Sequence, residues 1–292
     1  MTQDELRVRF QPIKDALNSC EEGIKVPSLW TVPEGFQQIR TTVKGVPVER
    51  LIPENWNGKT IFNMHGGGYV FALMDCYRDA SVLYSQVAGN AQVVNLDYRV
   101  APTHMAPAAL EDAVTVYQWL LEKGTKPEDI IFIGDSAGGN LVLVTGLYLR
   151  DHNIPLPGGM IAISPWASME PDLDSRKENA DNDLLLGNDG MDSNEVYKIT
   201  YHKNSDIRDP YVSPAYGDYT GMPSLLIQVG SYEMLRDDSI LTAEAAKKAG
   251  VDVTISIYDK MSHIFQIAVP DIEESKRAWE EVKSFINKVY AR

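Results

Sequence analysis

The sequence predicts an α/β fold: a mostly parallel sheet of about eight strands, flanked by helices and covered by a cap. Two observations carry this prediction. From residue 60 onward, short apolar runs alternate with longer amphipathic stretches, in the order strand then helix. The apolar runs are rich in Ile and Val, which is typical of strands buried on both faces of a parallel sheet.

The expected elements follow this rhythm along the chain. Two short alternating runs around Gly45 and Pro47 predict an antiparallel hairpin at one edge of the sheet. The apolar runs predict strands at TIFNM (60–64), AQVVNL (91–96), DIIFIG (129–134), MIAIS (160–164), SLLIQV (224–229) and VTISIY (253–258). The amphipathic stretches predict helices over 107–123, 137–150, 238–249 and 272–290.

Two segments do not fit the rhythm: residues 1–38, and a polar stretch rich in Asp and Asn over residues 169–209. A long insertion at the carboxyl ends of parallel strands usually covers a binding crevice. We therefore expect residues 1–292 to form one unit, in which these two segments make a cap over a catalytic core of residues 39–168 and 210–292.

Composition and charge exclude several classes of protein. Hydrophobic residues make up 44% and charged residues 23% of the 292 residues, as in ordinary globular proteins. The 41 acidic and 27 basic residues give a net charge of −14, which disfavours binding to nucleic acid or to anionic lipid. The charged start fits no signal peptide, and no apolar run approaches the roughly 20 residues of a membrane span. We expect a soluble, cytoplasmic protein without membrane insertion.

The two cysteines, Cys20 and Cys76, show neither CxxC spacing nor a neighbouring His. This pattern fits neither a disulfide framework nor a zinc site, so we expect two free thiols and no metal.

A GxSxG motif, GDSAG (134–138), lies directly between a predicted strand and a predicted helix. In this context the small residues at 134 and 138 allow a sharp turn that exposes the hydroxyl of Ser136 above the sheet. The helix start also offers the free amide of Ala137 and a partial positive charge. The motif predicts that Ser136 is a catalytic nucleophile.

A run of three glycines, HGGGY (65–69), follows the strand at 60–64. We expect the amides of Gly67 and Gly68 to join that of Ala137 in an oxyanion hole, with Gly66 shaping the turn. The alternative, a phosphate-binding loop, lacks the downstream Lys-Ser/Thr of such loops. His65 precedes the donors and is expected to anchor the loop rather than to transfer protons.

The general base should lie after the last strand, and His263, in DKMSHIF, has that position. The carboxylate that orients it should follow the strand at 224–229, where three acids compete. Glu233 is favoured, with Asp237 as the alternative, because Asp237 and Asp238 fall where the next helix begins and would serve as caps.

Together, HGGGY, YRVAP (98–102), PAALED (107–112), GDSAGG and the terminal His-Ile-Phe resemble the hormone-sensitive lipase family of α/β-hydrolases. The resemblance spans roughly residues 60 to 270. It implies an α/β-hydrolase fold with a cap, short-chain carboxylesterase activity, and oxyanion donors at Gly67, Gly68 and Ala137. Many members have Asp-Pro-Leu where this chain has Glu-Met-Leu (233–235), although some use Glu there.

These features predict a cofactor-independent serine carboxylesterase that acts on small-molecule esters through an acyl-enzyme. Candidate pocket aromatics are Trp30, Tyr69, Trp166 and Tyr197. The Tyr98-Arg99 and Glu111-Asp112 pairs are expected to form a structural polar network. An amide or lactone hydrolase on the same residues, or a non-catalytic small-molecule receptor, are the alternatives. The strand at 253–258 is also a candidate edge for homodimer pairing.

Overall fold

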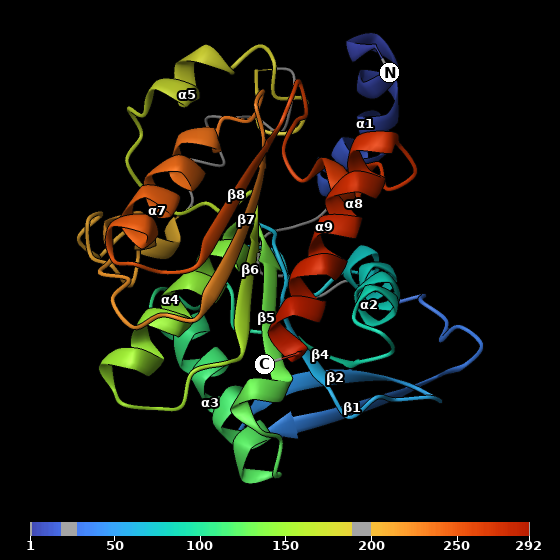
Figure 1. Ribbon diagram of the computed structural model, residues 1–292. Coiled ribbons are helices and arrows are strands. Elements are labelled where there is room, and N and C mark those ends of the chain that lie inside the picture. Colours follow the sequence, from blue (N-terminus) through green and yellow to red (C-terminus); the bar gives the residue numbers. More distant parts are fainter. Residues whose placement is uncertain (1, 19–27, 189–199, 292) are drawn as a thin grey trace.

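An eight-stranded sheet runs through the protein (Figure 1). The computed structural model describes residues 2–18, 28–188 and 200–291. Strand order is β1-β2-β4-β3-β5-β6-β7-β8, in which neighbours from β4 to β8 are parallel and β2 is antiparallel to both of its neighbours. The strands are β1 (Phe36–Val43), β2 (Val46–Pro53), β3 (Thr60–Met64), β4 (Gln92–Leu96), β5 (Ile130–Asp135), β6 (Gly159–Ile163), β7 (Ser224–Gly230) and β8 (Val253–Tyr258).

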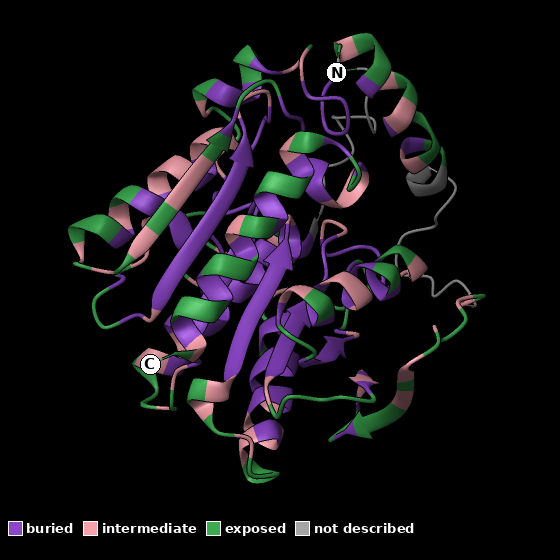
Figure 2. Cartoon of the chain, turned by 45° about the vertical axis from the view of Figure 1, so that its right-hand side comes forward, coloured by how far each residue is buried: buried purple, intermediate pink, exposed green. Residues whose placement is uncertain are grey.

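The strand predictions are confirmed to within one residue at each end, and the hairpin lies at the predicted edge. The reason is that β3 to β7 are buried at every position, so each one is a short segment in which apolar residues dominate. Asn63 and Asn95, which interrupt β3 and β4, hydrogen-bond to one another. Strand β8 is the opposite edge of the sheet, and Figure 2 shows exposed and intermediate positions along it.

Helices cover both faces of the sheet. In Figure 1, α3 (Ala108–Glu122), α4 (Ala137–Asp151) and α7 (Arg236–Lys248) lie on one side, and α2 (Asp75–Val87) and α9 (Glu273–Tyr290) on the other. The four helices predicted by periodicity are therefore present, with ends shifted by one or two residues.

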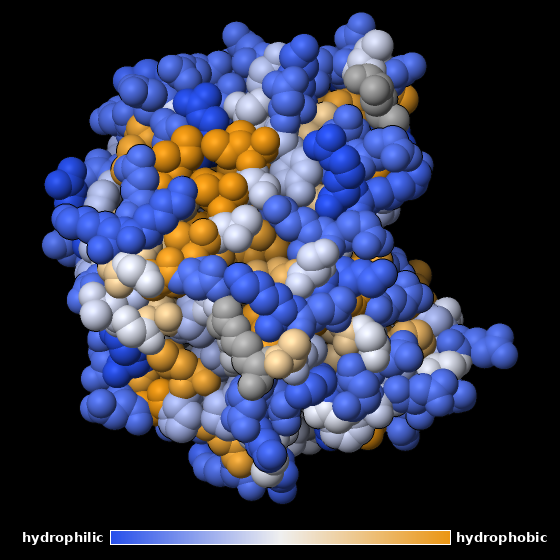
Figure 3. Space-filling view, viewed as in Figure 1, coloured by the Kyte–Doolittle hydropathy of each residue, from blue (hydrophilic) through white to orange (hydrophobic). Residues whose placement is uncertain are grey.

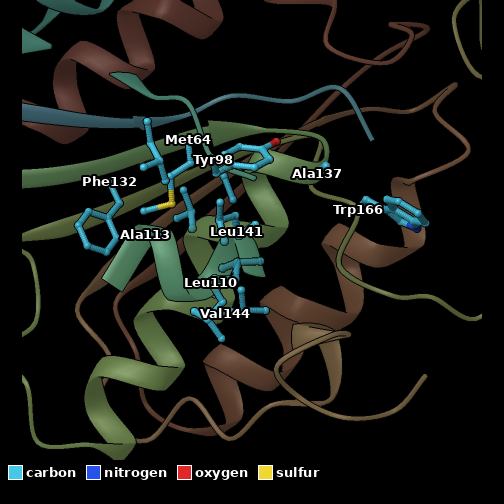
Figure 4. Close-up of a cluster of buried hydrophobic side chains, with 14 of the residues drawn as sticks. Met64, Tyr98, Leu110, Ala113, Phe132, Ala137, Leu141, Val144 and Trp166 are labelled. Carbon is cyan, nitrogen blue, oxygen red and sulfur yellow. The ribbon is translucent and has the colours of Figure 1, made fainter. Parts of the chain in front are cut away.

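Alternation along the strands divides the core between these two layers. Phe132 packs with Leu110 and Leu141 of the α3 and α4 layer, whereas its neighbours Ile131 and Ile133 pack against α2 and α9. Figure 4 shows the first cluster, in which Trp166 lies apart from the other labelled side chains, toward the carboxyl end of the sheet.

In Figure 1 the helix at residues 3–18 and the part of the insertion around residues 174–178 lie near the carboxyl ends of the strands, whereas residues 28–35 run beside α2 toward β1. Helix α1 (Gln3–Asn18) buries Leu6 and Phe10 against Leu184 and Leu185, which belong to the insertion at residues 169–209 between β6 and β7. Strand β1 already begins at Phe36, inside the first of the two segments predicted as a cap. The remaining short elements are η1 (Pro127–Asp129), α5 (Asp174–Glu178), η2 (Thr200–His202), η3 (Pro214–Tyr216) and α8 (Phe265–Ala268).

Among the helices of residues 2–18, 28–188 and 200–291, none combines the length and apolar character needed to span a bilayer.

Candidate active site

Ser136 occupies a strained turn between β5 and α4. Its backbone has φ +54° and ψ −120°, a conformation that costs energy for any residue with a side chain. The two flanking glycines make this turn possible. A Cβ on Gly134 would lie 2.4 Å from the carbonyl oxygen of Gly138, and one on Gly138 would lie 1.9 Å from that of Met64. The predicted elbow is thus present, and strand, turn and helix meet too closely for larger residues.

The glycine loop after β3 is held beside this turn by the residue that precedes the serine. The amide of Gly66 donates a hydrogen bond of 3.1 Å to Oδ1 of Asp135, and the hydroxyl of Tyr77 donates one of 3.2 Å to Oδ2. Beyond Gly66, both Gly67 (φ +106°) and Gly68 (φ +62°) are left-handed. The buried carboxylate of Asp135 therefore holds the glycine loop close to Ser136.

Burial in this setting raises the pKa of Asp135 to about 6, although the charge of His263 and the hydrogen bonds from Tyr77 and Gly66 favour its ionised form.

His263 and Glu233 form a buried pair. The imidazole Nδ1 lies 3.1 Å from Oε2 of Glu233, and the exposed fractions of the two side chains are 2% and 0%. The other carboxylate oxygen, Oε1, accepts hydrogen bonds from the hydroxyl of Ser164 (2.8 Å) and the amide of Gly230 (2.5 Å). Each carboxylate oxygen of Glu233 thus has its own hydrogen-bond partners, and only Oε2 faces the imidazole.

Burial shifts the pKa values of this pair. It raises the pKa of Glu233, against the opposing effect of the hydrogen bond with His263. For His263, burial favours the neutral ring, but the hydrogen bond and charge of Glu233, with the charges of Asp183 and Asp135, raise the pKa overall. The site therefore favours the imidazolium form more than water does.

The alternative acid, Asp237, points elsewhere. Its carboxylate accepts hydrogen bonds from the amide of Ser175 and from Nε of Arg236. Asp238 forms a buried ion pair with Arg176, at 2.6 Å. Of the three acids after β7, the structure places only Glu233 against His263.

Ser136 and His263 line one cavity of about 490 Å³, together with Gly67 and Gly68. Its walls are largely apolar and come from α1, α2, the insertion, α8 and α9, which contribute among others Ile13, Leu83, Leu185, Leu186, Ile267 and Trp279. In Figure 3 the right-hand outline is hollowed between the region of α1 and α8 and the region of α2. Volume and lining are typical of a pocket for a small organic molecule.

The predicted pocket aromatics differ in whether they line the cavity. Trp166 lines the cavity. Tyr69 does not: its ring stacks on Tyr201 at 3.9 Å and its hydroxyl donates to Asn140, so it faces the interior. Trp30 is also absent from the lining, although its indole N–H donates a hydrogen bond to Asp79, which is part of the lining. Tyr197 lies outside the described residues.

His65 is fully buried away from the cavity lining. Its ring stacks on Tyr98 at 4.2 Å, its Nδ1 lies 2.7 Å from the carbonyl oxygen of Gly66, and its own carbonyl accepts a hydrogen bond from the Tyr98 hydroxyl. These contacts fit the predicted anchoring role.

The polar network predicted around Arg99 is present. Arg99 donates to the carboxylate of Asp112 from both its amide (2.8 Å) and Nε (2.9 Å), and its guanidinium also pairs with Glu111 at 2.9 Å. The side chain of Arg99 is 41% exposed, so this network is only partly buried.

Three polar residues around the site were missed by the sequence reasoning: Asp135, Ser164 and Asp183. Asp135 is the last residue of β5, and Ser164 directly follows β6. Because the carboxyl ends of these strands meet at the site, their positions in the sequence are a signal that could have identified both residues. Asp183 is one of many acids in the insertion, and nothing in its local sequence marks it.

Cys76 is a free thiol that lines the cavity, and Cys20 lies outside the described residues. In the part of the chain that the structure describes, no group of three or more His, Cys, Asp or Glu side chains is arranged to hold a metal ion.

Comparison with known proteins places this geometry in a family. Residues 61–267 match a family described as alpha/beta hydrolase fold. An acetyl-hydrolase of Streptomyces hygroscopicus is 38% identical over 247 residues, which cover 84% of this chain and 81% of that protein.

Solved structures agree. An esterase from the bacterial hormone-sensitive lipase family has a TM-score of 0.81 and 34% identity, covering 99% of this chain and 92% of its own. EstE5 soaked with p-nitrophenyl butyrate has a TM-score of 0.84 and 34% identity, covering 97% of this chain and 99% of its own. The chain therefore belongs to the α/β-hydrolase family that includes the bacterial hormone-sensitive lipase esterases, and it is a serine carboxylesterase.

Proposed function

We propose that this carboxylesterase hydrolyses short-chain acyl esters through an acyl-enzyme, with Ser136 as nucleophile, His263 as general base and Glu233 as the orienting acid. One observation carries the proposal: His263, paired with the buried Glu233, lines the same cavity as the strained Ser136. A nucleophile and a base in one apolar pocket, with a carboxylate that orients the base, are the requirements for acyl transfer.

In the first step, Oγ of Ser136 attacks the ester carbonyl carbon while Nε2 of His263 takes the hydroxyl proton. The C=O electron pair moves onto the carbonyl oxygen, which accepts hydrogen bonds from the amides of Gly67, Gly68 and Ala137. Collapse of this intermediate breaks the bond to the alcohol oxygen, which leaves with the proton from His263. Water then attacks the acyl-enzyme in the same way and releases the acid.

Glu233 serves both steps by fixing the imidazole. Its Oε1 is occupied by Ser164 and Gly230, so Oε2 is left to accept the Nδ1–H of His263. This hydrogen bond leaves Nε2 unprotonated and able to take the serine proton.

The preference for short acyl chains has two supports. The similar Streptomyces protein is an acetyl-hydrolase, and EstE5 was soaked with a butyryl ester. In addition, residues 1–38 and 169–209 would act as a cap, because Ile13 and Leu185 bring the two segments to the wall of the cavity. Bulky residues on this wall leave limited room for a long chain.

The test is hydrolysis of p-nitrophenyl acetate, butyrate, octanoate and palmitate by the wild type and by Ser136→Ala. Activity that falls with chain length and disappears in Ser136→Ala is the expected result. Ser164→Ala is not a suitable control, because Ser164 contacts Glu233; the exposed Ser284→Ala, whose hydroxyl bonds only within α9, is one. A higher rate on a p-nitroanilide or a lactone than on every ester, or full activity in folded Ser136→Ala, would overturn the proposal.

A further inference from the structure

A carboxylate from the insertion contacts the backbone of both loops that carry the acid and the base. Oδ2 of Asp183 accepts a hydrogen bond of 2.9 Å from the amide of Met234, the residue after Glu233. Oδ1 accepts a longer one, 3.4 Å, from the amide of His263 itself. One side chain outside the catalytic core thus touches the main chain of the loops after β7 and β8.

The same carboxylate also organises its own segment. Oδ1 accepts hydrogen bonds from the amides of Leu185 (3.1 Å) and Leu186 (3.2 Å), which turn the chain directly after Asp183. Both leucines line the active-site cavity. Asp183 therefore fixes the cavity wall and the catalytic loops to one another.

The buried environment of Asp183 is unusual for a residue whose only role is to stabilise a turn. The residue is 2% exposed, and the four donors described above are neutral backbone amides. Burying a carboxylate without a cationic partner is costly, whereas an Asn or Ser would stabilise such a turn without a charge. A charge retained here has an effect on its surroundings that a neutral residue would not have.

That effect falls on the imidazole. The charged groups that act on His263 are Glu233, Asp183 and Asp135, which come from the loop after β7, the insertion and the end of β5. Each of the three carboxyl groups, when ionised, favours the imidazolium that forms as Ser136 attacks. Asp183 is the only one of the three that lies outside the catalytic core.

We propose that Asp183 is a positioning residue for ester hydrolysis: it aligns the loops of Glu233 and His263 through their backbone amides and adds a negative charge beside the imidazole to those of Glu233 and Asp135. The proposal rests on the roles proposed above for His263 and Glu233. It makes the insertion part of the catalytic apparatus as well as a cover for the pocket.

The test compares Asp183→Asn with Asp181→Asn, which makes the same change of charge two residues earlier at an exposed position. Rates on p-nitrophenyl acetate and butyrate are measured from pH 5 to 9. In Asp183→Asn, we expect kcat to fall about tenfold or more with KM within about twofold, because one amide must now face an NH₂ group.

The acid limb of the pH profile separates positioning from plain structural support. Loss of the negative charge disfavours the imidazolium, so the limb should move to lower pH by about 0.5 unit in Asp183→Asn and stay in place in Asp181→Asn. A folded Asp183→Asn with wild-type kcat, or with an unmoved limb and a raised KM, would overturn the proposal.

Asp183→Ser is a second test variant, for the case in which Asp183→Asn does not fold. Its hydroxyl still accepts a hydrogen bond from its own turn but carries no charge and is too short to reach Met234. It should show the same fall in kcat and the same shift of the limb, and wild-type behaviour here also contradicts the proposal. Ser136→Ala and Glu233→Gln are run in parallel: if these keep full activity, the proposed function fails, whatever Asp183 does.

Discussion

Nδ1 of His263 and Oε2 of Glu233 lie 3.1 Å apart with almost no exposure to solvent. Glu233 is four residues before Asp237, yet the chain turns so that only the first of these acids reaches the imidazole. The amide of Gly230 and the hydroxyl of Ser164 hold the far oxygen of Glu233, which leaves no freedom for the carboxylate to rotate. This arrangement makes the identity of the acid directly testable.

Glu233→Gln should lower kcat by about 10³ to 10⁴. The donors at Gly230 and Ser164 require an oxygen at the Oε1 position, so the NH₂ group of the glutamine would face Nδ1 of His263. That places the ring proton on Nε2, where it blocks proton transfer from Ser136. Steady-state rates on p-nitrophenyl acetate measure the effect, with Asp237→Asn as the matched control that keeps its rate. Full activity in Glu233→Gln and loss in Asp237→Asn would exchange the two roles.

Gly66→Ala should reduce kcat by about 10- to 100-fold. The new Cβ would lie 2.2 Å from Oδ2 of Asp135 and 2.7 Å from the Tyr77 hydroxyl, which forces the glycine loop away from the nucleophile. Gly45→Ala, in the β1–β2 turn, is the control: its φ of +95° makes alanine costly, but no atom blocks the Cβ and the site is remote. Rates and melting temperatures of both variants separate strain from lost catalysis. Equal kcat in the two variants would contradict this prediction.

Asp135→Asn should stabilise the fold in a pH-dependent manner. The pKa of Asp135 is raised from its ordinary 3.8 to about 6, so between these values the folded protein binds more protons than the unfolded chain, and stability falls as pH rises. Because asparagine does not ionise, the variant does not lose stability in this way as pH rises. The variant should match the wild type near pH 4 and exceed it by up to about 3 kcal/mol above pH 7.

Urea unfolding at pH 4.5, 6 and 8 measures this difference, with the exposed Asp259→Asn as control. A gap between Asp135→Asn and the wild type that does not grow with pH would show that burial does not shift the pKa of Asp135.

Arg176→Ala should destabilise the protein by about 3 to 5 kcal/mol. Arg176 and Asp238 are 4% and 0% exposed, and removal of the guanidinium leaves a buried carboxylate without its partner. The neighbouring Lys177 is 75% exposed, so Lys177→Ala should change stability by less than about 0.5 kcal/mol. Urea unfolding followed by tryptophan fluorescence provides the comparison. Similar midpoints for the two variants would show that the ion pair contributes little.

Which parts of this molecule were predictable depends on how locally they are encoded. The strands from β3 to β7 are each a short, mostly apolar run, and the elbow at Ser136 requires small residues at fixed spacing, so both are visible in the sequence. Side-chain direction after an irregular loop is not encoded in this way. Tyr69 follows three glycines, and its turn toward Asn140 and Tyr201 depends on contacts with residues more than 70 positions away.

The position of Asp183 was not predictable for a related reason. The insertion contains many acids, and the two amides that Asp183 binds in the catalytic loops lie 51 and 80 residues further along the chain. Its role depends on how the insertion packs back onto the core, which no local pattern records.

Ser136, Ser164, Glu233 and His263 follow β5, β6, β7 and β8, which are consecutive neighbours in the sheet. The position of each group therefore depends on the number of residues in its own strand, because each strand residue adds about 3.3 Å. A one-residue deletion within any of these strands would move one group out of line with the other three. Changes in length in the loops that lead into the amino ends of the strands, around residues 152–157 or 249–251, leave that alignment intact. This end of the molecule is where loops are free to lengthen, shorten or accept a fused domain while the enzyme stays active.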